Sequence, residues 1–211
     1  MTNKFDISAL VQDLEPVKPM RPQFPLLLSL LMTVLAVAVV VWFQGMRADL
    51  VAGKPDEMFL IRAGVLLLLG GATAHSVISM ASPAVGRSQN GWKMALAAAV
   101  LFPLAAIIVA TTGDLGPAFT AMDSGMRCMA YSLVGGLATA IPMIFWLRKG
   151  APTSPERAGW LTGLASGGLG AFAYNMHCPF NNVVYIGVWY TSALIICALL
   201  GRMIVPQLIR W

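Results

Sequence analysis

Residues 26–46 read LLLSLLMTVLAVAVVVWFQGM, a run of 21 residues without one charged side chain. A helix needs roughly 20 apolar residues to cross the hydrocarbon core of a bilayer. The run is too long for the apolar part of a secretory signal peptide, and no A-x-A-like cleavage site follows it before a soluble domain. We therefore expect residues 26–46 to form a retained membrane-spanning helix.

The composition of the whole chain agrees with this expectation. Hydrophobic residues make up 58% of the 211 residues, charged residues make up 11%, and the mean hydropathy is +0.75. A soluble domain carries about a quarter charged residues, so the composition excludes a soluble globular protein and makes the lipid bilayer a partner. The net charge of +5 would suggest nucleic acid in a soluble protein. Here we attribute it to membrane topology and expect no direct contact with nucleic acid.

Six apolar segments are long enough to span a bilayer, and short connections rich in Gly, Pro, Asp and Asn join them. None of these connections could hold a separate folded domain, which rarely stabilises itself below about 40 residues. The predicted fold class is therefore all-α, with a cytoplasmic tail over residues 1–25 and a six-span bundle over residues 26–211. The predicted spans are Leu26–Met46, Leu60–Ala81, Trp92–Thr112, Met126–Leu147, Gly159–Met176 and Tyr185–Pro206.

Lys and Arg residues divide unevenly between the two sides of the predicted bundle. Cytoplasmic flanks of membrane proteins are enriched in these residues, and a cytoplasmic N-terminus puts ten inside and four outside. We expect both termini in the cytoplasm and the protein in a bacterial inner membrane. The inner group is Lys4, Lys18, Arg21, Arg87, Lys93, Arg148, Lys149, Arg157, Arg202 and Arg210, and the outer group is Arg47, Lys54, Arg62 and Arg127.

The span interiors carry little chemistry. His75 is the only titratable residue that we place in a span core, whereas transporters and pumps usually carry ionisable residues there. The sequence has no Walker loop, nucleophile elbow, H-E-x-x-H or C-x-x-C motif. We expect no enzyme activity and no cofactor, although a small transporter or channel subunit stays as the alternative class of function.

The polar N-terminal tail contains one short amphipathic pattern. Ile7, Leu10, Val11 and Leu14 have the i, i+3, i+4, i+7 spacing of an apolar helix face, and Pro16 ends the pattern. A helix this short is marginal in water and needs a surface that covers its face. That surface is either the membrane interface or the groove of a cytoplasmic partner. The prolines at 19, 22 and 25 predict an extended link to the first span.

Two of the three cysteines fall on the predicted outer side. Cys128 follows Arg127, and Cys178 follows His177 in the turn MHCPFNN (176–182), while Cys197 lies within the sixth span. Positive neighbours make a thiol more reactive, and the outer compartment is oxidising. The pair could form a structural disulfide, a redox-sensing disulfide or a metal site. Cys128, Cys178 and His177 supply one ligand fewer than a structural zinc site uses, so a disulfide of either kind is favoured.

Four stretches carry a resemblance to a known family: LVQDLEPVKPM (10–20), LRKGAPTSPERAGWLTGLASGGLGAFAYNMHCP (147–179), VWY (188–190) and LGRMIVPQLIRW (200–211). Together they resemble the NrsF family of six-span bacterial anti-sigma factors, and the YNMHCP turn and the C-terminal P-x-L-I-R-W are the most specific parts. Cys128 and Cys178 stand at the family's two cysteine positions. Cys197 does not belong to that pattern.

The resemblance implies a protein that holds an extracytoplasmic-function sigma factor at the inner membrane and releases it on an envelope, redox or metal stress signal. The segment that contacts the sigma factor would lie in the tail, and the outer cysteines would report on the envelope. A homodimer is compatible with this interpretation. The residues that would contact the partner are Ile7, Leu10, Val11, Leu14, Pro16 and Val17.

Overall fold

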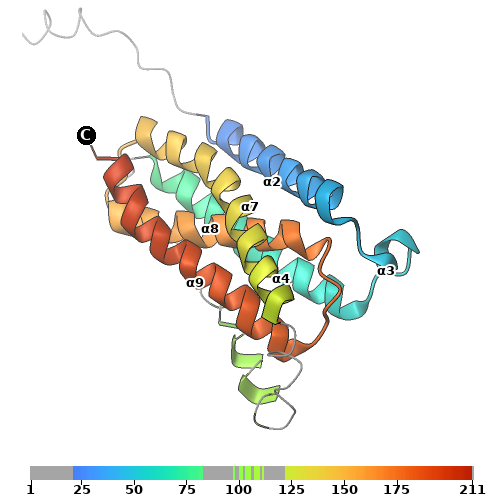
Figure 1. The fold of residues 1–211 in the computed structure, drawn as a ribbon. Coiled ribbons are helices and arrows are strands. Elements are labelled where there is room, and N and C mark those ends of the chain that lie inside the picture. Colours follow the sequence, from blue (N-terminus) through green and yellow to red (C-terminus); the bar gives the residue numbers. More distant parts are fainter. Residues whose placement is uncertain are drawn as a thin grey trace, which may run out of the picture.

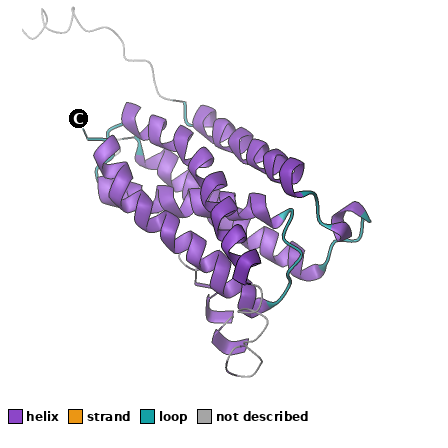
Figure 2. Cartoon of the chain, viewed as in Figure 1, coloured by secondary structure: helices purple, strands orange, loops and turns teal. Residues whose placement is uncertain are grey.

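The fold is known from a computed structural model, which describes residues 21–82, residues 122–210 and scattered residues between 97 and 111. The regular secondary structure of the described residues is entirely helical (Figure 2), as the sequence predicts. Helices pack side by side in one bundle, with both ends of the described chain at the same side (Figure 1). The helices are α2 (Gln23–Gln44), α3 (Ala48–Val51), α4 (Glu57–Met80), α7 (Met122–Lys149), α8 (Pro155–Asn175) and α9 (Val183–Leu208).

Five of the six predicted spans correspond to observed helices, with ends that differ by a few residues. The remaining predicted span, Trp92–Thr112, and the predicted tail helix lie largely outside the described residues. One expectation is wrong: the chain is not extended up to Pro25, because α2 begins at Gln23 and includes Pro25. A proline is tolerated in the first turn of a helix, where its missing N–H would have no partner within the helix.

The most deeply enclosed helix is α8, which packs against α4, α7 and α9. Buried positions follow one another through nearly its whole length from Ala158 to Asn175. Glycines allow the neighbouring helices to surround α8 because they let the helix backbones approach closely. Small residues commonly serve this purpose between helices in membranes. Thus α8 is held by backbone proximity rather than by large side chains.

The contact between α8 and α9 shows this directly. A Cβ atom added to Gly159 would lie 2.7 Å from the Gly201 carbonyl oxygen, and one added to Gly167 would lie 2.9 Å from the Cys197 Cβ. At Gly163 the added atom would collide with the backbone of Cys197 and Ala198. The four-residue glycine repeat of α8 is therefore a packing stripe against α9.

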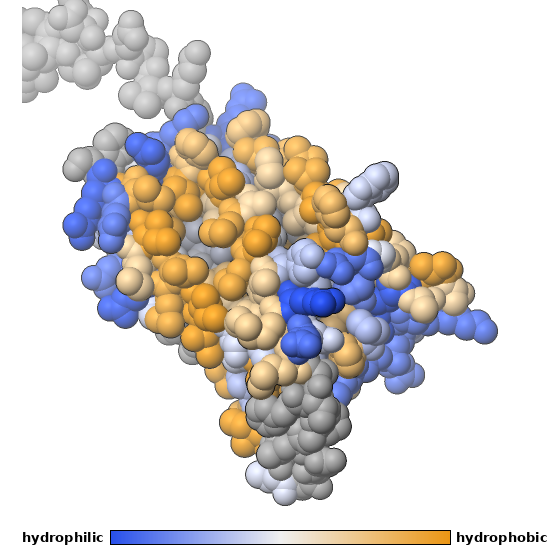
Figure 3. All heavy atoms as spheres, viewed as in Figure 1, coloured by the Kyte–Doolittle hydropathy of each residue, from blue (hydrophilic) through white to orange (hydrophobic). Residues whose placement is uncertain are grey.

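Apolar side chains cover the outer surface of the bundle. Four described helices, α2, α4, α7 and α9, are long and apolar enough to cross a membrane. Their exposed faces carry large hydrophobic residues, and polar residues gather toward the two ends of the molecule (Figure 3). Helix α8 has a comparable length of 21 residues but a lower hydropathy, since it is rich in Gly, Ala and Ser and is enclosed by the others. The fold is thus that of a membrane protein.

Two buried clusters define the two ends of the bundle. One contains Cys128, Cys178 and Tyr185, and we call it the cysteine end. The other contains Ala81, Leu147 and Ile209, and we call it the Ala81 end. Helices α4 and α7 both finish at the Ala81 end, where the Trp146 indole Nε1 donates to the Ile78 carbonyl oxygen at 3.2 Å and the Ala151 N–H donates to the Ala81 carbonyl oxygen at 3.1 Å. The chain therefore leaves α4 at one end of the bundle and enters α7 at the other.

We predict that Gly163→Leu disrupts the bundle, because the new side chain has no space between α8 and the α9 backbone. Overpacking costs about 1–3 kcal/mol or more, so the variant should melt at a lower temperature in detergent. Gly71→Leu is the matched control: it makes the same substitution in α4 at an exposed position, where an added Cβ would meet nothing within 4 Å. Equal melting temperatures for the two variants would contradict the packing interpretation.

Candidate functional site

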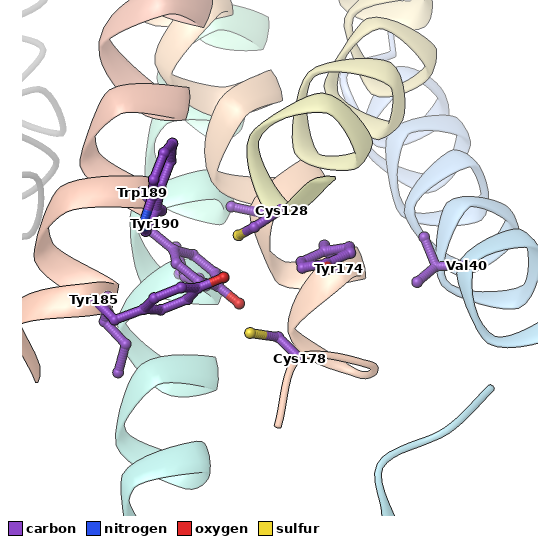
Figure 4. Packing of buried hydrophobic residues seen from close by; sticks show 10 residues of the cluster. Val40, Cys128, Tyr174, Cys178, Tyr185, Trp189 and Tyr190 are labelled. Atoms are coloured by element: carbon purple, nitrogen blue, oxygen red, sulfur yellow. The ribbon is translucent and has the colours of Figure 1, made fainter. Parts of the chain in front are cut away.

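The two outer cysteines of the sequence analysis meet in one buried cluster. Cys128 comes from the second turn of α7 and Cys178 from the connection between α8 and α9, and their side chains are 0% and 1% exposed. Figure 4 shows both thiols at the cysteine end of the bundle, pointing into the same region. Both are free thiols in this structure, so the predicted disulfide stays a prediction.

Aromatic side chains surround the two thiols. Tyr185 and Tyr190 reach in from α9, and their hydroxyl groups point toward the thiols (Figure 4). Tyr174 from α8 closes another side and stacks on Tyr131, with ring centroids 5.7 Å apart. The hydroxyl oxygens of Tyr185 and Tyr190 are buried without a hydrogen-bond partner among the described residues. The cysteines thus lie in a buried aromatic environment that still contains hydroxyl groups without a partner among the described residues.

Residues 176–182, which we call the cysteine turn, are held by two arginines that are distant in sequence. The Cys178 carbonyl oxygen accepts from Arg47 Nη1 at 2.6 Å and from Arg62 Nη2 at 3.2 Å. Arg62 Nη1 also donates to the Phe180 carbonyl oxygen at 2.7 Å, and Arg47 Nη1 donates to Asn181 Oδ1 at 3.2 Å. Charge-assisted hydrogen bonds are about twice as strong as neutral ones, so these contacts fix the backbone on either side of Pro179.

Arg47 connects the cysteine turn to the end of α2. Its backbone N–H donates to the Met176 carbonyl oxygen at 3.1 Å, and its guanidinium forms an ion pair with Asp49 at 2.9 Å. The hydrogen bond from Arg47 is the main reason why the pKa of the Asp49 carboxyl lies well below its usual range. Asp49 therefore remains charged and balances Arg47, whose side chain is only 3% exposed.

Arg62 is more deeply buried, and no carboxylate among the described residues pairs with it. It lies in the second turn of α4 with 0% exposure, and its guanidinium lies over the Tyr190 ring at 5.1 Å from the centroid. Its Nε is buried without a hydrogen-bond partner among the described residues. Arg62 is therefore part of the interior of the bundle and not the flanking charge that the sequence predicts, and the prediction that His75 is the interior titratable group is wrong. The His75 side chain is exposed.

The residues next to the cysteines in sequence are not their closest charged partners. Arg127 is exposed, because consecutive residues of a helix point in different directions. His177 Nδ1 lies 3.0 Å from the Gly45 carbonyl oxygen and therefore ties the turn to the end of α2. Within residues 21–82 and 122–210, no three His, Cys, Asp or Glu side chains converge as metal ligands, so Cys128, Cys178 and His177 do not form a three-ligand group there.

The two thiols differ in their surroundings. Cys178 lies outside the helices, and the Cys128 thiol beside it, acting as a hydrogen-bond donor, lowers the pKa of the Cys178 thiol. The positive charge of Arg62 lowers this pKa further, while burial raises it and the lowering effects win. The cysteine turn thus combines a thiol that ionises readily with a backbone held by two guanidinium groups.

Of the other predicted site residues, Ile7, Leu10, Val11, Leu14, Pro16 and Val17 lie outside the described residues. Sequence reasoning missed Arg47, Arg62, Tyr185 and Tyr190. The signal for Arg62 was present, since an arginine inside an apolar run is costly unless it has buried partners.

Taken together, the apolar bundle and its buried two-cysteine end define an all-helical integral membrane protein whose distinctive chemistry lies at one end. The chain belongs to the NrsF family, described as negative regulator of sigma F, which matches residues 10–211. It is 31% identical over 176 residues to the anti-sigma-F factor NrsF of Caulobacter vibrioides (strain NA1000 / CB15N), covering 81% of this chain and 80% of that protein.

A second relative is the probable anti-sigma-F factor NrsF of Azospira oryzae (strain ATCC BAA-33 / DSM 13638 / PS), which is 24% identical over 169 residues. That alignment covers 78% of each chain. No solved structure matches this chain.

We predict that Arg47→Gln weakens the cysteine end. The variant loses the guanidinium bond to the Cys178 carbonyl oxygen and the ion pair with Asp49. The Cys178 carbonyl oxygen keeps its bond from Arg62, but a hydrogen bond that involves a charged group contributes about 1.5–3 kcal/mol, so its loss should lower the melting temperature in detergent. Arg148→Gln removes an exposed charge at the Ala81 end and serves as the control. If both variants melt like the parent, Arg47 does not support the turn.

Proposed function

We propose that this chain is a membrane-bound anti-sigma factor that holds an extracytoplasmic-function sigma factor through its N-terminal tail and releases it on an envelope, redox or metal stress signal. The observation that carries this proposal is the family match over residues 10–211, together with two relatives named as anti-sigma-F factors. The apolar bundle is consistent with a protein that keeps a soluble partner at a membrane.

The tail is the part of the chain best suited to bind the partner. Ile7, Leu10, Val11 and Leu14 form one apolar face at helical spacing, and Pro16 and Val17 follow directly. An amphipathic helix of this kind binds by inserting its apolar face into a groove of its partner. The tail enters α2 at Arg21, on the side of the bundle where the C-terminal residues also lie (Figure 1).

A cytoplasmic position of that side would bring the tail to the compartment of sigma factors. The described basic residues support it: six belong to the Ala81 end, and the four at the cysteine end include two buried ones, Arg47 and Arg62. Helices α4 and α7 run in the same direction, which agrees with the prediction that the span Trp92–Thr112 crosses the membrane between them. The six basic residues are Arg21, Arg148, Lys149, Arg157, Arg202 and Arg210.

The cysteine end is then the sensing site of the inner-membrane protein, facing the oxidising envelope. A reversible disulfide requires two thiols close together, with Cα atoms within about 7 Å of each other, and Cys128 and Cys178 belong to one buried cluster. A bond between Cys128 and Cys178 would join α7 to the cysteine turn, and the turn is already tied to α2 through Arg47 and His177. A change in the conformation of the cysteine turn can therefore shift α2, the helix that follows the tail.

The tail is tested by Leu10→Asp combined with Leu14→Asp. Each loss of a buried leucine costs about 2–5 kcal/mol, and 1.4 kcal/mol is tenfold in affinity, so binding of the sigma factor should weaken at least about a hundredfold. Co-purification of the sigma factor with membranes measures this. Ser8→Asp with Gln12→Asp adds the same charge on the opposite helix face and should retain the partner. If the leucine variant retains the sigma factor at the membrane as fully as the parent does, the proposal that the tail binds the sigma factor is wrong.

The cysteine pair is tested by Cys128→Ser and Cys178→Ser, each compared with Cys197→Ser. Both outer variants should insert into the membrane as the parent does but alter the release of the sigma factor under oxidative stress, measured with a reporter of its target promoters. Cys197 lies in α9 against the α8 glycines, so its replacement should leave the response unchanged. Normal release in all three variants would show that the signal enters elsewhere.

A further inference from the structure

Arg62 poses a problem of charge balance at the cysteine end. Removing a guanidinium ion from water costs several kcal/mol unless an anion and good hydrogen bonds compensate for it. Arg62 is 0% exposed, and its two Nη atoms donate to backbone carbonyls, which carry no net charge. Among the described residues, the one ion pair is that of Arg47 with Asp49. The counter-charge of Arg62 must therefore come from another kind of group.

The same region has hydrogen-bond donors without acceptors. Buried polar groups are nearly always hydrogen-bonded, so each exception points to a missing partner. Here the exceptions within the described chain include Arg62 Nε and the hydroxyls of Tyr185 and Tyr190. The two hydroxyls point toward the thiols of Cys128 and Cys178 (Figure 4). Several donors and one uncompensated cation around two sulfur atoms are the surroundings that an anionic sulfur requires.

We propose that Cys178 is the reactive cysteine of the pair, held as a thiolate by Arg62 and the tyrosine hydroxyls, and that Cys128 is the resolving thiol. Arg62 is then a positioning residue that sets the charge of the sulfur. The inference deepens the proposed sensing role and rests on it, because it says which sulfur reacts first. The ligand class is small, soft electrophiles such as thiosulfonates and disulfides.

The positions of the two cysteines explain why their roles differ. Cys178 lies on the cysteine turn, its own carbonyl receives both guanidinium groups, and the next residue, Pro179, is exposed. Cys128 is equally buried, but it lies within α7, where its backbone is part of the helix. The lowered pKa of the Cys178 thiol agrees with this assignment. A small reagent entering beside Pro179 reaches Cys178 first.

The chemistry can be written for methyl methanethiosulfonate as a probe. The Cys178 thiolate attacks the sulfenyl sulfur, the sulfur–sulfur bond of the reagent breaks, and methanesulfinate leaves, which gives a methyl disulfide on Cys178. Cys128 then loses its proton and attacks the Cys178 sulfur, and methanethiolate leaves. The products are a Cys128–Cys178 disulfide, methanesulfinate and methanethiol. The reagent is the oxidant, and the two cysteines supply the two electrons.

The roles are separated by the intact mass of the purified full-length protein in detergent, in a Cys197→Ser background. With one equivalent of reagent, Cys128→Ser should keep the methylthio group, whereas the parent pair should lose it and end two hydrogens lighter. Cys178→Ser should react at least about tenfold more slowly. A stable adduct on Cys128 in the Cys178→Ser protein, formed as fast as in the Cys128→Ser protein, would overturn the assignment.

The role of Arg62 is tested by the pH dependence of the same reaction in the Cys128→Ser protein. Arg62→Gln should raise the pH midpoint of the reaction by a unit or more, which lowers the rate at least about tenfold at pH values well below the parent midpoint. Arg62→Lys should restore most of the rate because it keeps the charge. Arg127→Gln removes an exposed arginine that adjoins Cys128 in sequence, so its midpoint should stay close to that of the parent.

Two outcomes would overturn the pairing of Arg62 with a thiolate. One is an unchanged midpoint in Arg62→Gln, which would mean that an anion from solution balances the arginine. The other is an equal shift in Arg127→Gln and Arg62→Gln, which would make the effect one of net positive charge at the cysteine end rather than of Arg62 itself. Neither measurement uses a sigma factor, so failure here differs from loss of partner retention, which would contradict the proposed function.

Discussion

The Cys178 carbonyl oxygen, which accepts from two buried guanidinium groups, is the interaction on which the cysteine end depends. Arg47 and Arg62 come from the end of α2 and the start of α4, and the carbonyl comes from the connection between α8 and α9. A single backbone atom therefore joins three separate parts of the chain. The cost of burying Arg47 is offset by Asp49, and part of the cost for both cations is offset by charge-assisted bonds to carbonyls and by aromatic faces.

The bundle around this interaction is built to bring backbones close together. Gly163 and Gly201 let α8 and α9 touch, and Gly170 does the same for α8 and α7 at Gly136. Hydrophobic burial drives little association between helices in lipid, so close van der Waals contact takes its place. A central helix packed in this way fixes the position of its last residue, and the cysteine turn begins there. The glycines thus contribute to the site although none of them is part of it.

The sequence was sufficient for the helices but not for the chemistry between them. Apolar runs predicted α2, α4, α7, α8 and α9 within a few residues, because the thickness of a bilayer sets the length of a span. The pairing of Cys178 with Arg62 was not predicted, since 116 positions separate them and no periodicity encodes which helices are neighbours. Adjacency in sequence pointed to Arg127 instead, and Arg127 is exposed. The start of α2 was misplaced because proline is permitted in a first turn.

Helix α2 connects the cysteine turn to the tail. Its buried stripe consists of Ser29, Thr33, Ala36 and Val40, which are small and present a smooth face to the bundle. Its described polar ties to the bundle lie at its end, where the Gly45 carbonyl meets His177 and Arg47 meets the turn. Small side chains interlock little, so resistance to sliding or tilting of α2 comes mainly from these ties. Under the proposed function, a change in the backbone of Cys178 would therefore act at the point where α2 is held most firmly.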